Sequence, residues 1–242
     1  KGKHCRKLHP DFSLHAVEEE LFHKITGESY ERLRQAMRYL DDKGFHYTTN
    51  TVVFEWNYRH LPGLARQLTK HAAYLHNFIL MNAYYEWNAE GRAFGVQAKY
   101  SEVYPYLKEA VAILESEKVA VNVRYAPLCT MRGLERNLVG MIGVRYDPYE
   151  WMNNGGHMGG EPEFCAARIR LDEGNVEEHL SFKPVRFTYD NGVVVTGVRG
   201  DNLKYFADAC TTCRAIDLCD GIDPNYLKLY GSEEFRPYDS PL

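Results

Sequence analysis

Residues 11–125 alternate between short runs rich in branched or aromatic side chains and longer segments with apolar residues at helical spacing. The short runs are Asp11–His15, His46–Phe54, Phe78–Asn82 and Val119–Tyr125. The helical segments begin at or near Ser29, Pro62 and Tyr100. Because parallel strands need a crossover connection, four strands and three helices in strict alternation predict a parallel sheet with right-handed crossovers. The sequence therefore predicts an α/β fold.

Residue signals set the expected ends of the helices. Ser29 has the side chain of an N-cap, and Gly44 stops the apolar spacing that follows it. The second helix is expected to begin near Pro62, with an apolar side that extends to Ala72 and Leu75.

The alternating pattern ends at Tyr125, which predicts two parts, residues 1–125 and residues 126–242. Within the first part, residues 18–27 are expected to be a charged connection. Within the second part, residues 126–160 carry no regular periodicity and are expected to be loops.

Two shorter elements are expected near the C-terminal end. Asn191-Gly192 lies between two branched or aromatic runs and predicts a β-hairpin, because this dipeptide accepts the positive φ angles of a tight turn. Asp223 is then expected to cap a short helix that Gly231 ends.

Three cysteines lie within ten residues in the sequence Cys210-x2-Cys213-x5-Cys219. This spacing lets one turn and the start of a helix direct three sulfur atoms at a common point. Clustered thiols at ligand spacing indicate a metal or redox site, whereas buried free thiols or disulfides are the alternative. The best candidate for a fourth ligand is Cys129, which follows the last predicted strand, and Cys165 competes with it. Four thiolates suit either tetrahedral zinc or a [4Fe-4S] cluster.

Composition limits the classes of partner. The chain has 242 residues and a formal net charge of -4, so it has no general attraction for phosphate backbones, although a local basic groove stays possible. It contains no apolar run long enough to cross a bilayer. We therefore expect neither a membrane nor a nucleic acid as partner, and we expect a cytoplasmic protein. A disulfide-stapled secreted protein is disfavoured.

Two groups of residues resemble radical S-adenosylmethionine enzymes that carry an auxiliary iron-sulfur cluster. The first group is Asp11-Phe-Ser-Leu-His-Ala16, residues 23–32, residues 49–53, Asn57 and Leu61-Pro62. It is similar to the fourth and fifth strands of the partial (βα)6 barrel in that superfamily. The second group is the Cys210–Cys219 cluster with Gly221, Tyr226 and Tyr230-Gly231, which is similar to the start of the cysteine-rich extension known as SPASM.

The resemblance implies a fold and a set of ligand residues. The fold is the second half of a partial barrel followed by a SPASM-like or twitch-like extension with a hairpin. The residues implied to bind S-adenosylmethionine are Ser13, His15, Asn50 and Asn57. The residues implied to hold one auxiliary [4Fe-4S] cluster are Cys129, Cys210, Cys213 and Cys219. Asp223 stands where the full extension would have a further cysteine, so a second cluster in the extension is not expected.

The implied activity is an oxidoreductase or transferase reaction in which a 5′-deoxyadenosyl radical takes a hydrogen atom from a small-molecule or peptide substrate. An external donor such as flavodoxin or ferredoxin would supply the electron. The Cys-x3-Cys-x2-Cys segment that binds the S-adenosylmethionine-cleaving [4Fe-4S] cluster is missing from this sequence. We therefore expect the C-terminal part of a longer enzyme, inactive by itself, and no catalytic residue is assigned. The alternative is a non-catalytic scaffold or binding module that holds zinc on a degenerate half barrel.

Overall fold

The computed structural model describes residues 10–81, 95–139, 185–188, 194–197, 205–219 and 221–240. The chain divides into two compact units. Unit 1 comprises residues 1–81, 92–124 and 136–138, and unit 2 comprises residues 82–91, 125–135 and 139–242. Among the described helices, none combines the length and the apolar character that crossing a membrane requires.

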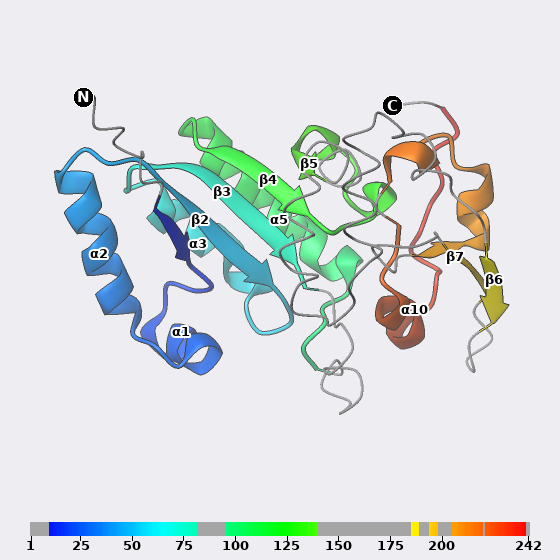
Figure 1. Ribbon diagram of the computed structural model, residues 1–242, viewed down its shortest axis with the longest axis horizontal. Helices are drawn as coiled ribbons and strands as arrows, with labels where there is room; N and C mark the ends of the chain where they lie inside the picture. The colour runs from blue at the N-terminus through cyan, green and yellow to red at the C-terminus, as the bar shows by residue number, and fades with distance from the viewer. Residues whose placement is uncertain are drawn as a thin grey trace, which may run out of the picture. The chain divides into compact units, whose positions relative to one another are not determined.

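Unit 1 is built on a sheet with the strand order β1-β2-β3-β4-β5 (Figure 1). The strands are β1 Asp11–Ser13, β2 Tyr47–Val53, β3 Ala73–Leu80, β4 Ala120–Arg124 and β5 Leu138–Val139. The first four strands pair in parallel with their sequence neighbours. The predicted parallel α/β architecture is confirmed.

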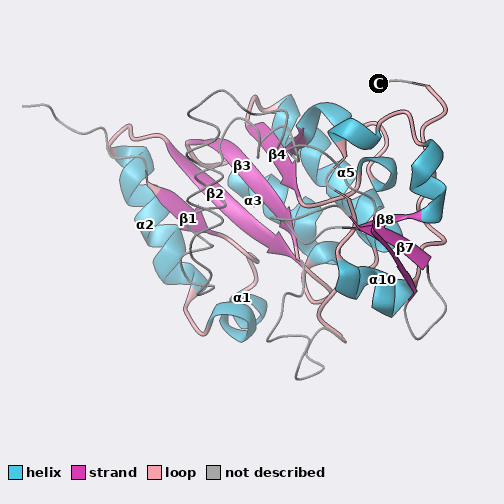
Figure 2. Ribbon diagram, turned by 45° about the vertical axis from the view of Figure 1, so that its right-hand side comes forward, coloured by secondary structure: helices cyan, strands magenta, loops and turns pink. Residues whose placement is uncertain are grey.

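The helices of this unit are α1 Glu19–Thr26, α2 Tyr30–Asp42, α3 Leu61–Leu68 and α5 Tyr100–Ser116, with a 3-10 turn η1 Tyr58–His60. Figures 1 and 2 show α3 and α5 together on one face of the sheet and α2 beside the edge strand β1. The apolar spacing of α5 explains this packing, because Val103, Leu107 and Leu114 recur on one side and are buried. Leu64 and Leu68 of α3 are buried in the same layer.

Two local expectations for unit 1 are wrong. Residues 18–27 contain the helix α1 rather than a connection, and Gly27 ends it in the left-handed region with φ 76°. Phe22 is the buried residue of this short helix, so the sequence offered little apolar periodicity. The second expected helix stops at Leu68. Ala73–Leu80 form the strand β3, so Leu75 belongs to a strand and not to this helix. The pairing of β3 with β2 and β4 outweighs the helical spacing in this stretch.

Asp41, in the last turn of α2, connects three elements at the start of the sheet. Its carboxylate accepts hydrogen bonds from the Tyr47 hydroxyl at 2.8 Å and from the Ala72 N–H at 2.9 Å. The Nδ1 atom of His71 lies 2.7 Å from the other carboxylate oxygen. Burial alone would raise the pKa of this carboxyl, but the bonds from Ala72, His71 and Tyr47 hold the pKa below its usual range.

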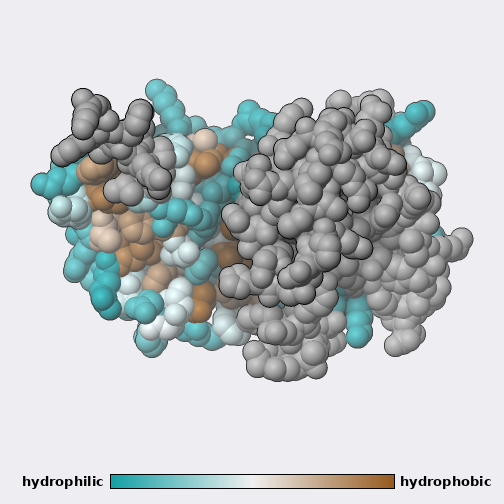
Figure 3. Space-filling model, viewed as in Figure 1, coloured by the Kyte–Doolittle hydropathy of each residue, from teal (hydrophilic) through white to brown (hydrophobic). Residues whose placement is uncertain are grey.

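The sheet has one covered face and one face without a described helix on it. Side chains of β2 alternate, so that Thr49 and Thr51 are buried toward α3 and α5 while Asn50 and Val52 are half-buried on the other face. Figure 3 views unit 1 from this second face and shows hydrophilic residues interleaved with hydrophobic ones. We call it the open face of the sheet.

Unit 2 contains a three-stranded antiparallel sheet and several short helical turns. Its strands are β6 Val185–Thr188, β7 Val194–Gly197 and β8 Tyr205–Ala207. Its turns and helix are η2 Leu128–Thr130, η4 Asp208–Thr212, η5 Ile216–Leu218 and α10 Pro224–Tyr230. β6 and β7 pair antiparallel, and the Asn191-Gly192 turn predicted between them lies outside the described residues. The predicted helix after Asp223 is confirmed, since its carboxylate accepts the Asn225 N–H at 2.8 Å as an N-cap.

Candidate metal centre

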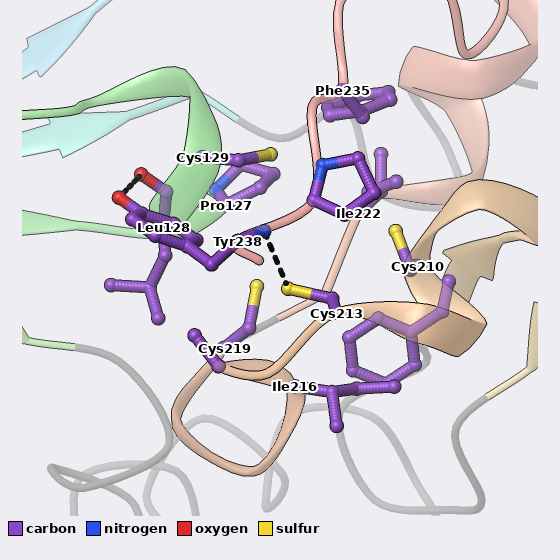
Figure 4. Close-up of a pocket in the computed structure, with 13 residues that line it drawn as sticks. Pro127, Leu128, Cys129, Cys210, Cys213, Ile216, Cys219, Ile222, Phe235 and Tyr238 are labelled. Atoms are coloured by element: carbon purple, nitrogen blue, oxygen red, sulfur yellow. Dashed lines mark hydrogen bonds between the residues drawn. The ribbon is translucent and has the colours of Figure 1, made fainter. Parts of the chain in front are cut away.

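Four cysteines line one pocket of unit 2 (Figure 4). They are Cys129, Cys210, Cys213 and Cys219. The close-up shows their sulfur atoms turned toward the space that the four side chains enclose. The whole pocket, which apolar side chains line as well, has an empty volume of about 360 Å³, including its part open to solvent. The structure therefore brings together the four thiols that the sequence singled out.

Two successive 3-10 turns position three of these thiols. Cys210 lies within η4, and the Cys213 N–H closes that turn on the Cys210 carbonyl at 3.0 Å. η5 follows, and the Cys219 N–H bonds to the Ile216 carbonyl at 3.1 Å. Each turn ends at a cysteine. The spacing from Cys210 to Cys213 is therefore set by the hydrogen bond that closes η4, and Cys219 is placed by the bond that closes η5.

Cys129 reaches the same pocket from the segment that follows β4. Tyr125 has φ 67°, a left-handed conformation that turns the chain directly after the strand. Pro127 then starts the turn η2, which the Thr130 N–H closes on the Pro127 carbonyl at 3.0 Å. This course of the chain agrees with the prediction that Cys129 lies in a loop that follows a strand.

Burial keeps two of the thiols protonated in the absence of a metal. Burial, with a smaller contribution from the nearby thiols of Cys129 and Cys213, raises the pKa of the Cys210 thiol to about 12. Burial also raises the pKa of the Cys129 thiol, against a backbone N–H of Arg236 that lowers it. Because metals bind thiolates, a centre held here must displace these protons, and its affinity rises with pH.

The walls of the pocket are mostly apolar. Phe206, Ile222 and Phe235 line it and are at most 4% exposed. Two backbone donors reach the sulfur atoms, from Tyr238 N–H to Cys213 Sγ and from Gly221 N–H to Cys219 Sγ, both at 3.4 Å. Apolar walls and N–H···S bonds are the features through which proteins tune iron-sulfur clusters.

A donor set of four thiols suits two kinds of inorganic centre. Tetrahedral zinc with bonds of about 2.3 Å would draw four sulfur atoms to within about 4 Å of one another. Among the described residues, no group of three or more His, Cys, Asp or Glu side chains is close enough together to hold a metal ion as the side chains stand. Four thiols that line one pocket are ligands for either tetrahedral zinc or a [4Fe-4S] cluster.

Unit 1 carries a second polar feature, a row of amides across the open face. Asn50, Asn77 and Asn122 stand opposite one another on β2, β3 and β4. Asn122 donates to Asn77 at 2.9 Å, Asn77 donates to Asn50 at 2.7 Å, and Asn50 donates to the Asp11 carboxylate of β1. The sequence predicted Asn50 as a site residue but neither Asn77 nor Asn122, because only the strand register shows that the three residues lie opposite one another.

Ser13 is the last residue of β1, and His15 lies two residues after it. Ser13 is exposed and stands opposite Asn50 in the strand register. The His15 Nδ1 accepts the Val52 N–H at 3.2 Å, and burial lowers the pKa of this imidazole. His15 is therefore neutral near pH 7, with its proton on Nε2. Ser13 and Asn50 thus stand at paired positions of β1 and β2, while the binding of S-adenosylmethionine by Ser13, His15 and Asn50 stays a prediction.

Asn57 is buried, and its polar atoms contact the main chain. Its Oδ1 accepts the Phe54 N–H at 2.9 Å, and its Nδ2 donates to the carbonyls of His15 and Val52 at 2.9 and 2.8 Å. These bonds join the ends of β1 and β2. The structure therefore gives Asn57 a loop-fixing role, while its predicted contact with a ligand stays a prediction.

Replacing Asn57 by Ala should lower the free energy of unfolding by about 2–4 kcal/mol, because one N–H and two carbonyls lose their partner at a buried site. Urea denaturation followed by circular dichroism measures the change. Gln67→Ala, which truncates an exposed amide on α3, is the control and should stay within about 0.5 kcal/mol of the parent. Equal stability of the two variants would contradict the role given to Asn57.

Comparison with known proteins gave few matches. No family model and no curated protein matches the sequence. Among solved structures, the chain is similar to a domain of pyruvate-formate lyase-activating enzyme from Bacteroides vulgatus ATCC 8482, with 14% sequence identity and a TM-score of 0.37. The similar region covers 47% of this chain and 65% of that chain.

Proposed function

We propose that unit 2 holds a [4Fe-4S] cluster on Cys129, Cys210, Cys213 and Cys219, and that this chain works as part of a radical S-adenosylmethionine enzyme. The observation that supports the proposal most strongly is the convergence of Cys129 with the three clustered cysteines on one pocket. When bound, the cluster would accept and donate single electrons. The residues of this chain bind it, exclude water with apolar side chains and donate N–H groups to its ligands.

Ser13, His15 and Asn50 of unit 1 would bind S-adenosylmethionine in this proposal. Parallel α/β sheets hold their ligands at the carboxyl ends of the strands, and Ser13 is the last residue of β1. The neutral His15 would offer its Nε2–H as a donor. Asn57 would support this site by fixing the backbone around His15 and Val52. The reaction would be hydrogen-atom abstraction from a small-molecule or peptide substrate.

Metal analysis of anaerobically purified chain, reconstituted with ferrous iron and sulfide, tests the cluster. We expect about four iron and about four acid-labile sulfide per chain, a brown colour that dithionite bleaches, and an electron paramagnetic resonance signal after reduction. Colourless protein with about one zinc per chain and no sulfide would contradict the proposal and support the zinc-binding scaffold.

A further inference from the structure

Arg132 connects the segment Arg236–Tyr238 to the cysteine pocket of unit 2. Its guanidinium donates to two successive carbonyls, that of Arg236 at 3.0 Å and that of Pro237 at 2.9 Å. It also lies 4.1 Å from the centre of the Tyr238 ring. Both bonds come from the Nη2 atom, and the planar guanidinium stacks on the Tyr238 ring at the same time, which suits arginine.

The bond from Arg132 to Pro237 determines where a neighbouring N–H points. The Pro237 carbonyl and the Tyr238 N–H belong to one planar trans peptide group, so they point in opposite directions. A guanidinium that holds the carbonyl on one side therefore directs the N–H to the other side. That N–H donates to Cys213 Sγ at 3.4 Å (Figure 4). The positive charge of the guanidinium next to the Pro237 carbonyl also polarises this peptide group and makes the Tyr238 N–H a stronger donor.

Further contacts hold Tyr238 in place. The Arg214 N–H bonds to its carbonyl at 2.9 Å, one residue after Cys213. The Tyr238 hydroxyl donates to the Glu135 carboxylate at 2.9 Å and lies 3.3 Å from the Leu128 carbonyl, next to Cys129. The backbone N–H of Arg236 bonds to the Cys129 thiol and lowers its pKa against the effect of burial. One short segment thus contacts two of the four cysteines.

We propose that Arg132 is a positioning residue that sets the N–H···S hydrogen bond from Tyr238 to Cys213 and thereby raises the reduction potential of the centre held there. This inference rests on the proposed cluster. Hydrogen bonds to the ligand sulfur atoms stabilise the reduced, more negative state of an iron-sulfur cluster. Loss of the bond should therefore make the cluster harder to reduce.

The test uses the full 242-residue chain, reconstituted anaerobically with iron and sulfide. In Arg132→Gln we expect unchanged iron and sulfide, and a tenfold smaller equilibrium constant for one-electron reduction, which is about 59 mV toward negative potential. In deuterated buffer, pulsed electron-nuclear double resonance should show the loss of a strongly coupled deuteron, because the Tyr238 N–D no longer points at Cys213 Sγ.

Two further variants test whether the placement of the Arg132 guanidinium or only its positive charge affects the cluster. Arg132→Lys keeps the charge but lacks the planar guanidinium that stacks on the Tyr238 ring and so fixes the donor at the Pro237 carbonyl, so it should also lose the coupled deuteron. Arg59→Gln is the control, because Arg59 likewise stacks 4.1 Å over a tyrosine but belongs to unit 1 and bonds Glu55. Arg59→Gln should leave both the reduction potential and the deuteron coupling unchanged.

The outcomes distinguish this inference from the proposed function. A parent chain without iron and sulfide overturns both. A parent chain with a cluster, together with Arg132 variants that keep its potential and deuteron coupling, overturns only the role of Arg132. Retention of the deuteron in Arg132→Lys assigns the effect to charge and likewise overturns the positioning role. If Arg132→Gln does not fold, the deuteron signal of Arg132→Lys alone decides between these results.

Discussion

Cys129→Ala is expected to reduce the iron content of the reconstituted chain from about four atoms to three or fewer. Cys129 supplies the fourth thiol of the pocket, so in the proposed cluster its loss would leave one iron without a protein ligand. Such an iron dissociates readily, and the oxidised sample should then show the resonance of a three-iron cluster. Iron and sulfide analysis with electron paramagnetic resonance of the oxidised protein measures the effect.

Cys165→Ala is the matched control for this experiment. Cys165 competed with Cys129 as fourth ligand in the sequence and lies outside the described residues. It should leave about four iron per chain. A loss of iron in Cys165→Ala together with full occupancy in Cys129→Ala would reverse the assignment of the fourth ligand.

Asp41→Ala is expected to lower the free energy of unfolding by about 3–5 kcal/mol at pH 7, because the Tyr47 hydroxyl and the Ala72 N–H lose their acceptor at partly buried sites. The bond to His71 is lost as well. Asp42→Ala, which removes the neighbouring exposed carboxylate, should change the stability by about 0.5 kcal/mol or less. Urea denaturation of both variants provides the comparison.

The effect of Asp41 should also depend on pH. Its hydrogen bonds hold the carboxyl pKa below the unfolded value of about 3.9, so its contribution is fully present above that pH. As the pH falls through the lower folded pKa, the folded carboxylate is protonated and the contribution is lost. The difference in stability between the parent and Asp41→Ala should therefore shrink below about pH 4. A difference that grows with acidity would contradict the bonding described for Asp41.

Local sequence signals predicted those elements whose stabilising contacts lie close in sequence. The branched run at 46–54 became β2, and the apolar spacing from Tyr100 became α5. Asp223 caps α10 through the N–H groups of Asn225 and Tyr226, which are two and three residues away. Contacts of this range depend on residue type and spacing, which a sequence shows directly.

Elements stabilised by distant partners were harder to predict. Ala72 and Leu75 continue the helical spacing of the preceding segment, yet Leu75 belongs to β3, which pairs with β2. Asn77 and Asn122 could not be joined to Asn50 before the strand register was known, because a shift by one residue turns a side chain to the other face.

By itself, the sequence determined the parallel α/β class of unit 1 and the set of thiols worth considering, since periodicity and the spacing of Cys210, Cys213 and Cys219 are local properties. Only the tertiary structure decided that Cys129 shares a pocket with these three, and that the Tyr238 N–H points at Cys213. The physical reason is that burial and hydrogen bonding between segments far apart in the chain select these neighbours. No spacing rule encodes the apolar walls or the guanidinium of Arg132 that hold the distant segments together.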